Sequence, residues 1–141
     1  MNYNIISESD RRIPRKRIEK MMQLIEEEEE PPESSINIIF VRDNRIKKLN
    51  KEFRKVNRPT DVLSFNIDSE PGVENVFGEI YISTDTAFRY AREDGINFQS
   101  MLIKLCCHGY LHLLGFDHER DEDARLMKSK ELLFWDRYYK C

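Results

Sequence analysis

All three histidines of the chain lie in one stretch, NFQSMLIKLCCHGYLHLLGFDH, residues 97–118. Asn97 is a residue type that caps helix N-termini, and Gly115 is the type that accepts the left-handed conformation after a helix. Between them, apolar residues recur at helical spacing: Met101, Leu102, Leu105, Leu111 and Leu114. The pattern therefore predicts a long helix, 97–115, that carries two histidines near its C-terminal end.

The spacing of the histidines is typical of a metal site. Residues four apart on a helix share one face and lie about 6 Å apart, so His108 and His112 can direct two imidazoles at one point. Gly115 lets the chain turn sharply, and His118 can then return over the helix end. Three imidazoles with an open fourth position are typical of a catalytic zinc site, because structural sites normally have four protein ligands. We therefore expect one Zn²⁺ per chain at His108, His112 and His118.

The residue after the first histidine separates this motif from that of the metzincin peptidases. Their pattern, HExxHxxGxxH, places a glutamate there as the general base. This chain has Gly109 at that position. Peptide hydrolysis is therefore disfavoured, although a bound ion would still lower the pKa of a water molecule.

Three further residues near the histidines have simpler interpretations. Cys107 lies about 100° around the helix from His108, which is the wrong direction for the same metal. Cys106 and Cys107 are therefore interpreted as small core residues. Asp117 has two interpretations that the sequence leaves open, a hydrogen bond to a ligand imidazole or a cap of the turn after the helix.

The flanking sequence alternates between strand and helix patterns. Apolar runs predict strands at 3–6, 36–41, 62–67 and 79–83, with a turn-rich segment at 68–78. Apolar residues at helical spacing predict helices after Pro14, after Asp43, at 85–94 and at 121–139. We expect Asp43 to cap its helix, Phe53 to lie on the buried face of that helix, and glutamates 26–30 to form a solvated helix end. These elements indicate an α+β fold, a small mixed β-sheet of about four strands packed with four to five helices.

Length and composition fit a single domain over residues 1–141. The chain has 40% hydrophobic and 35% charged residues, which is too apolar for a disordered acidic chain and too charged for a membrane protein. It begins without a signal-peptide pattern and contains no run of about 18 apolar residues. Three cysteines are an odd number and two of them are adjacent, which favours free thiols in a reducing compartment. We expect a cytoplasmic protein with no membrane partner.

The net charge of −3 is an average that hides a basic segment. Residues 42–58 carry eight Arg and Lys side chains against Asp43 and Glu52, a local charge of +6. Most such cations lie on a solvated helix face. Arginines of the loop 54–58 are different, because a loop beside a metal can present a guanidinium to a phosphate oxygen. Phosphodiester hydrolysis needs a cation of this kind to hold the developing charge.

Three segments resemble the YbeY family of bacterial rRNA maturation factors, in the same order and at the expected spacing. They are LNKEFRKVNRPTDVLSFNID (49–68), FGEIYIS (77–83) and HGYLHLLGFDHE (108–119). The resemblance implies a zinc-dependent, single-strand-specific endoribonuclease of the cytoplasm that acts in small-subunit rRNA maturation and ribosome quality control. It implies His108, His112 and His118 as zinc ligands and Arg54 as the residue implicated in activity. The implied partners are single-stranded RNA, rRNA, the small ribosomal subunit and assembly factors, and no DNA is expected.

Four positions differ from the usual pattern of that family. Phe116 stands where tyrosine is common, Asn66 replaces a proline, Lys55 replaces a glycine, and Glu79 replaces an aspartate. None of the four removes an implied zinc ligand. The change at Glu79 keeps a carboxylate and lengthens it, which leaves its role open.

The leading hypothesis is therefore a metal-dependent endoribonuclease in which a metal-bound water attacks the phosphodiester while Arg54 holds the phosphate. A second hypothesis keeps the ion but gives it a structural role in a domain that only binds rRNA or an assembly factor. A third is a metallopeptidase-like hydrolase, which Gly109 disfavours.

Overall fold

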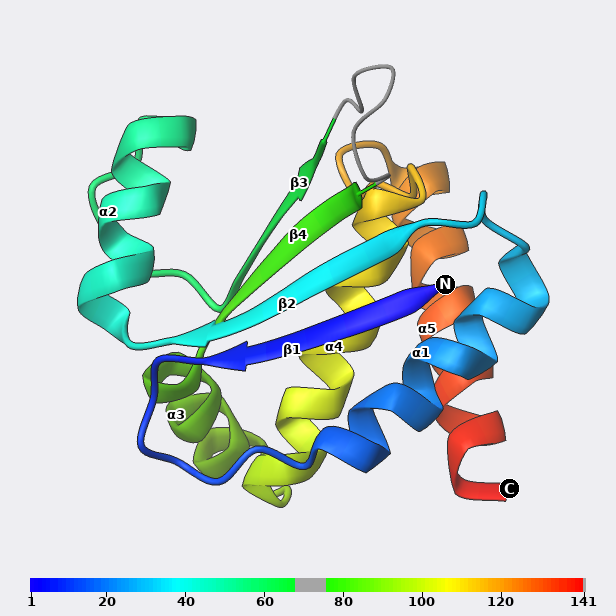
Figure 1. Ribbon diagram of the computed structural model, residues 1–141, viewed down its shortest axis with the longest axis horizontal. Helices are drawn as coiled ribbons and strands as arrows, with labels where there is room; N and C mark the ends of the chain where they lie inside the picture. Colours follow the sequence, from blue (N-terminus) through cyan, green and yellow to red (C-terminus); the bar gives the residue numbers. More distant parts are fainter. Residues whose placement is uncertain (68–75, 141) are drawn as a thin grey trace.

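The computed structural model describes residues 1–67 and 76–140. The elements in chain order are β1 (Asn2–Ser7), α1 (Arg15–Glu29), β2 (Ser35–Val41), α2 (Asp43–Arg54), β3 (Val62–Asn66), β4 (Val76–Ser83), α3 (Thr84–Asp94), α4 (Phe98–Leu113) and α5 (Asp121–Lys140). The predicted α+β fold, a four-stranded mixed sheet packed with helices, is confirmed (Figure 1). Within the described residues, no helix is both long enough and apolar enough to cross a membrane.

The sheet has the strand order β1-β2-β4-β3. β1, β2 and β4 run parallel, and β3 pairs antiparallel with β4. Parallel neighbours need a crossover connection, which α1 supplies between β1 and β2. β3 is therefore an edge strand, and one side of its backbone faces away from the sheet.

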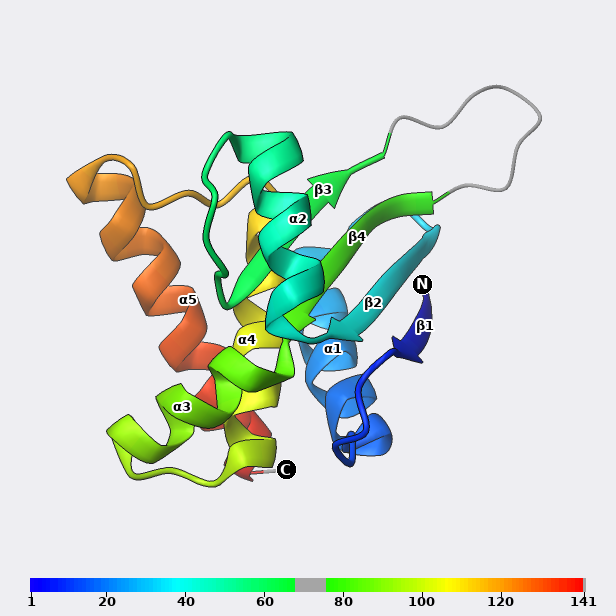
Figure 2. The same ribbon diagram turned by 90° about the vertical axis from the view of Figure 1, so that its left-hand side faces the viewer.

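Most of the core lies between one face of the sheet and the helices α1, α4 and α5 (Figures 1 and 2). α4 is the central helix of this layer, since it contacts α1, α3, α5, β3 and β4. Its apolar residues point in several directions, as expected for a helix that is buried nearly all round. Fully buried residues at the centre are Ile18, Met22, Phe40, Ile80, Leu102, Tyr110 and Leu111. Each large side chain of this kind stabilises the fold by about 1.5–3 kcal/mol.

The opposite face of the sheet is only partly covered, by α2. Ile46 and Leu49 of α2 form a second, smaller cluster with three sheet residues: Ile39, Val41 and Leu63. The prediction that Phe53 is buried is wrong, because its side chain is 58% exposed. Phe53 lies one turn beyond Leu49, past the end of that cluster, and the ring beside it is that of Phe65 at 5.1 Å.

Asp43 is not the cap of α2, which corrects the sequence prediction. Arg42 holds the N-cap position and Asp43 belongs to the first turn. The Asp43 carboxylate accepts hydrogen bonds from the hydroxyls of Ser83 (2.6 Å) and Thr86 (2.7 Å) and pairs with Arg89 (2.9 Å). Burial raises the pKa of Asp43, but these contacts outweigh it, so that the pKa is lowered. Asp43 thus ties the start of α2 to the start of α3.

The sequence suggested that the glutamates at the end of α1 are only solvated. In the structure, two of them form ion pairs. Glu28 pairs with Arg137 at 2.9 Å, and Glu29 pairs with Lys130 at 3.1 Å. Both cations belong to α5, which packs against α1. The acidic helix end therefore joins two helices that are far apart in the sequence.

Two other predictions concern the turn-rich segment and the cysteines. β4 begins at Val76, so that 76–78 is strand and not turn. The rest of that segment, 68–75, lies outside the described residues, as does Cys141. Cys106 and Cys107 are buried in the main core, which confirms their interpretation as core residues.

α4 lies very close to the sheet at Gly109. A Cβ atom at this position would lie 2.7 Å from Cγ2 of Ile80, 3.1 Å from Oγ of Ser64 and 3.2 Å from Cγ2 of Val62. The Ser64 hydroxyl also donates a hydrogen bond to the Gly109 carbonyl at 2.9 Å. The lack of a side chain at 109 therefore lets α4 lie directly on β3 and β4.

Gly109→Ala should make the protein less stable, by about 1–3 kcal/mol, because the added methyl group overpacks the contact with Ile80 and Val62. The direction of this change in stability is informative, since alanine in place of glycine inside a helix normally stabilises the protein by about 0.5–1 kcal/mol. Chemical denaturation of the two proteins measures the difference. A variant more stable than the wild type would contradict the close approach of α4 to the sheet.

Candidate metal centre

The three histidines meet at the C-terminal end of α4. His108 and His112 belong to the helix, and His118 lies on the loop that follows it. Gly115, with φ of +100°, redirects the chain so that the loop returns over the helix end. The candidate ligand atoms of the three side chains lie within 4.8 Å of one another. The structure thus brings together all three residues that the sequence predicted as ligands, and this group could hold a metal ion.

The orientation of His108 is set by a carboxylate. Its Nδ1 lies 2.7 Å from Oε1 of Glu131 on α5. Because a carboxylate accepts, Nδ1 donates to it, and in a neutral imidazole this arrangement leaves the lone pair on Nε2. That Nε2 lies 3.0 Å from Nε2 of His112. Two nitrogens bound tetrahedrally to one zinc ion would be about 3.3–3.4 Å apart, so only a small adjustment fits the pair to an ion.

The electrostatics of His112 favour its neutral form. Burial lowers the pKa of His112, and the neighbouring His108 and His118 lower it further. A neutral imidazole is the form that binds metals, because its ring nitrogen must offer a lone pair. The donor set therefore fits a divalent ion that accepts nitrogen ligands, as zinc does.

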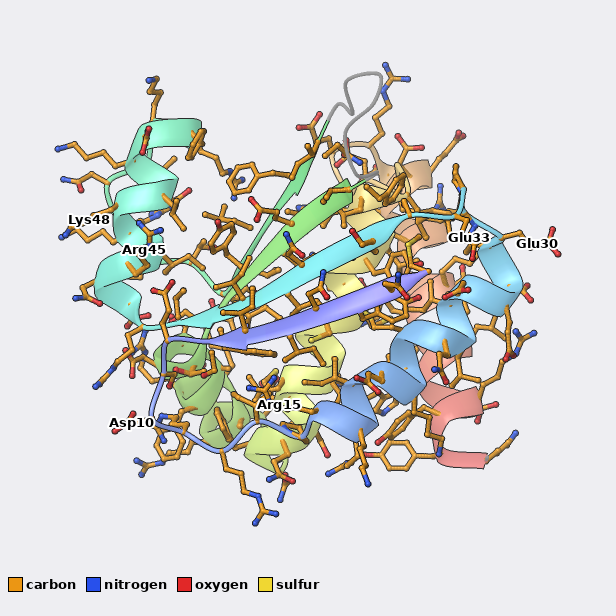
Figure 3. The ribbon with its side chains drawn as sticks, in the orientation of Figure 1. Asp10, Arg15, Glu30, Glu33, Arg45 and Lys48 are labelled. Carbon is orange, nitrogen blue, oxygen red and sulfur yellow. The ribbon has the colours of Figure 1, made fainter. Side chains whose placement is uncertain are left out.

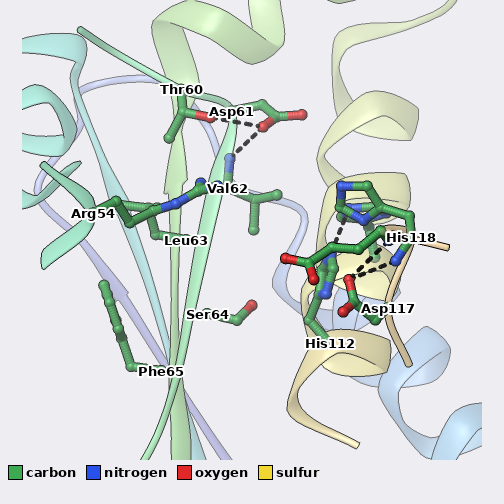
Figure 4. A pocket seen from close by; sticks show the side chains of 12 residues that line it. Arg54, Thr60, Asp61, Val62, Leu63, Ser64, Phe65, His112, Asp117 and His118 are labelled. Carbon is green, nitrogen blue, oxygen red and sulfur yellow. Dashed lines mark hydrogen bonds between the residues drawn. The ribbon is translucent and has the colours of Figure 1, made fainter. Parts of the chain in front are cut away.

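The histidines line a cleft of about 610 Å³ beside the edge strand β3 (Figure 4). Successive strand residues point to opposite faces, so Val62 and Ser64 face α4 whereas Leu63 and Phe65 face the side of α2. Arg54, the last residue of α2, lines the same cleft from that far side of β3. The cleft therefore spans both sides of the edge strand, with a guanidinium on one side and the imidazoles on the other.

Asp117 caps the turn, which decides between its two interpretations. Its Oδ1 accepts hydrogen bonds from the backbone N–H groups of His118 (2.6 Å) and Glu119 (3.3 Å). The carboxylate therefore holds the backbone that carries His118.

Two of the positions that differ from the family pattern adjoin the cleft. Lys55 is the C-cap of α2 and has φ of +62°, a conformation that favours glycine, directly after Arg54. The Asn66 side-chain amide donates a hydrogen bond to the carbonyl of Leu113 at 2.9 Å, at the end of α4. The substitution by asparagine thus adds a link between β3 and the histidine-bearing helix.

The side chains at the other two differing positions point elsewhere, although the backbone of Phe116 is hydrogen-bonded to the imidazole of His112. Glu79 is on the α2 face of the sheet, where its carboxylate accepts hydrogen bonds from Asn37 at 3.4 Å and from Tyr81 at 3.5 Å. Phe116 packs against the main core, with the ammonium of Lys130 5.8 Å from its ring centroid. Neither side chain lines the cleft.

Glu131 is a candidate functional residue that the sequence did not reveal. It lies 23 positions after His108, on a helix that carries several other acidic residues. No spacing motif joins it to the histidines, because only the packing of α5 on α4 brings them together. Glu131 also lines a second cavity, of about 220 Å³, that shares Asp61 and His108 with the first.

Comparison with known proteins agrees with this arrangement. Residues 4–138 match the family described as Endoribonuclease YbeY. The chain belongs to the YbeY family. Curated relatives named Endoribonuclease YbeY occur in Anaeromyxobacter dehalogenans, 48% identical over 70% of this chain, and in Desulforamulus reducens, 42% identical over 76% of this chain. The match covers 51% of the first relative, about half of its length, and 74% of the second.

A solved structure supports the same fold. The solution structure of TM1509 from Thermotoga maritima is similar to this chain with a TM-score of 0.66 and 33% identity. The similarity covers 98% of this chain and 89% of that one. The resemblance inferred from the sequence motifs is therefore confirmed.

Glu131→Gln and Glu131→Ala should weaken metal binding by about 10-fold to 100-fold, because a ligand imidazole loses the carboxylate that orients it. Competition with a chelator of known affinity measures the dissociation constant. Asp136→Asn is the matched control, since Asp136 is an exposed carboxylate of the same helix that pairs with Lys140. Metal affinity equal to that of the wild type in both Glu131 variants would contradict the proposed role.

Proposed function

We propose that this protein is a zinc-dependent endoribonuclease that cleaves single-stranded RNA, with one ion held by His108, His112 and His118. The observation that carries the proposal is the cluster of three imidazoles in a cleft whose opposite wall holds Arg54, in a chain of the YbeY family. We further propose that residues 1–141 act as one domain in the cytoplasm, on small-subunit rRNA, together with the ribosomal small subunit and assembly factors.

The cleft residues have different roles in phosphodiester hydrolysis. His108, His112 and His118 would hold a divalent ion, which would supply Lewis-acid chemistry and lower the pKa of a water molecule. Glu131 keeps the His108 lone pair directed at the ligand position, and Asp117 holds the backbone of His118. The Arg54 guanidinium binds the phosphate across β3 and offsets the negative charge that grows during the reaction.

The geometry at Gly109 argues against the peptidase alternative. The position where metzincins carry their catalytic glutamate lies so close to Ile80 and Val62 that even a Cβ atom there requires a neighbour to shift. A glutamate side chain would therefore be strongly disfavoured at this position. The non-catalytic alternative is disfavoured by the three-histidine donor set in an open cleft, because structural zinc is normally enclosed by four protein ligands.

His112→Ala should remove both zinc and RNA cleavage while the protein remains folded, because His112 contributes a ligand at the rim of the core. Zinc content is measured by elemental analysis, and activity by cleavage of a defined single-stranded RNA. The circular dichroism spectrum shows whether the variant is folded. Chelator-treated wild type, reloaded with zinc, is the positive control. Cleavage at the wild-type rate by His112→Ala would contradict the proposal. Loss of zinc and cleavage with retained folding and RNA binding would exclude the non-catalytic alternative.

Arg54→Ala should lower cleavage by about 100-fold to 1,000-fold, the effect of removing one group that stabilises transition-state charge. Its zinc content should equal that of the wild type, because the guanidinium contacts the phosphate and not the ion. Lys16→Ala removes an exposed cation of α1 and controls for net charge. Zinc loss in Arg54→Ala would contradict the assignment.

A further inference from the structure

Three aromatic side chains form a continuous row beside the cleft, on the sheet face that α2 only partly covers. We call this row the aromatic ladder; it consists of Phe53, Phe65 and Tyr81. The ring centroids of Phe53 and Phe65 are 5.1 Å apart, and those of Phe65 and Tyr81 are 6.0 Å apart. The ladder therefore runs from the end of α2 across β3 to β4.

The ladder is accessible at its outer end. Phe53 is 58% exposed, and Phe65 and Tyr81 are half-buried beside the small cluster under α2. A single exposed apolar side chain is common, but several in contact form a surface that a ligand can cover. Aromatic rings offer faces on which nucleobases stack with little regard to base identity.

The charges around the ladder favour a nucleic acid. Phe53 belongs to α2, which carries exposed cations, and within the described residues Lys48, Lys51 and Arg54 form no salt bridge. The side chains labelled on α2, Arg45 and Lys48, lie at one end of the molecule, whereas Glu30 and Glu33 lie at the other (Figure 3). An RNA backbone that follows α2 would therefore contact positively charged side chains and lie far from Glu30 and Glu33.

Glu79 is a carboxylate on the same sheet face, and it suits bases better than phosphates. It is paired with the neutral side chains of Asn37 and Tyr81. A carboxylate repels phosphate but accepts hydrogen bonds from base amino groups. The inner end of the ladder thus provides a polar contact for a base, while the cations of α2 remain for the backbone.

The ladder is continuous with the candidate active site. Phe65 and Arg54 both line the cleft, and Phe65 is also the central ring of the ladder. A strand whose phosphate is bound by Arg54 can therefore continue onto Phe53 and Phe65 without leaving the protein surface.

We propose that the aromatic ladder is a stacking surface for the nucleobases of single-stranded RNA that flank the cleavage position, with the α2 cations on their phosphates. The proposal rests on the proposed function of the cleft. It explains how a small protein could select unpaired RNA, because bases held in a duplex cannot stack on side chains.

The test measures binding of a single-stranded RNA of about eight nucleotides that carries 2-aminopurine, whose fluorescence reports stacking. Phe53→Ala and Phe53→Leu in the zinc-loaded full chain should bind about 5-fold to 150-fold more weakly, the loss expected for one stacked base. Phe53→Trp should bind as tightly as the wild type. Tyr139→Ala removes a 57% exposed ring of α5 and should bind normally. An oligomer with abasic flanking positions should bind the wild type and Phe53→Ala equally.

The outcomes separate the ladder from the catalytic proposal. RNA affinity equal to that of the wild type in Phe53→Ala would overturn the proposed stacking surface. Wild-type affinity in Phe53→Leu would also overturn it, because leucine offers no aromatic face. Phe53-dependent binding without any cleavage would support the ladder and contradict the proposed nuclease activity. Cleavage without Phe53-dependent binding would support the nuclease activity and contradict the proposed role of the ladder.

Discussion

The close approach of α4 to β3 and β4 is the contact on which the candidate site depends. Two glycines make it possible, because a Cβ atom at Gly109 would lie 2.7 Å from Ile80 and one at Gly78 would lie 2.7 Å from Leu113. With α4 seated there, His108 and His112 emerge beside the edge strand, where a cleft is open to solvent. The same contact disfavours any side chain, including a glutamate, directly after the first histidine. One packing constraint thus positions the candidate ligands and separates this chain from peptidases that share its histidine spacing.

The site is assembled from elements that are distant in the sequence. The imidazoles come from α4 and the loop after it, Glu131 comes from α5, and Arg54 comes from the end of α2. His108, His112 and Glu131 belong to helices that pack on the core, whereas His118 lies on an exposed loop whose backbone Asp117 holds. The cleft can reach both Arg54 and the histidines because β3 lies at the edge of the sheet. If another strand were paired to its free side, that strand would separate Arg54 from the histidines.

Features that depend on neighbouring residues were predictable from the sequence, and features that depend on distant packing were not. Periodicity predicted the strands and helices, and the spacing of His108, His112 and His118 predicted their cluster. Glu131 was missed because nothing near it in the sequence distinguishes it from the other acidic residues of α5. Phe53 was predicted as buried because helical periodicity does not show that this turn of α2 packs only beside Phe65 of the edge strand. Asp43 was predicted as a cap because its true partners, Ser83 and Thr86, lie 40 and 43 residues away in the sequence and local pattern does not reveal them.

We propose that the histidine-bound ion and Arg54 would contact the same phosphate of a single-stranded RNA. A crystal structure of the zinc-loaded protein with a non-hydrolysable single-stranded RNA tests it most directly. We expect one ion on His108, His112 and His118, a phosphate oxygen beside that ion, and the Arg54 guanidinium on the same phosphate. An ion enclosed by four protein ligands, or RNA bound away from the cleft, would contradict it.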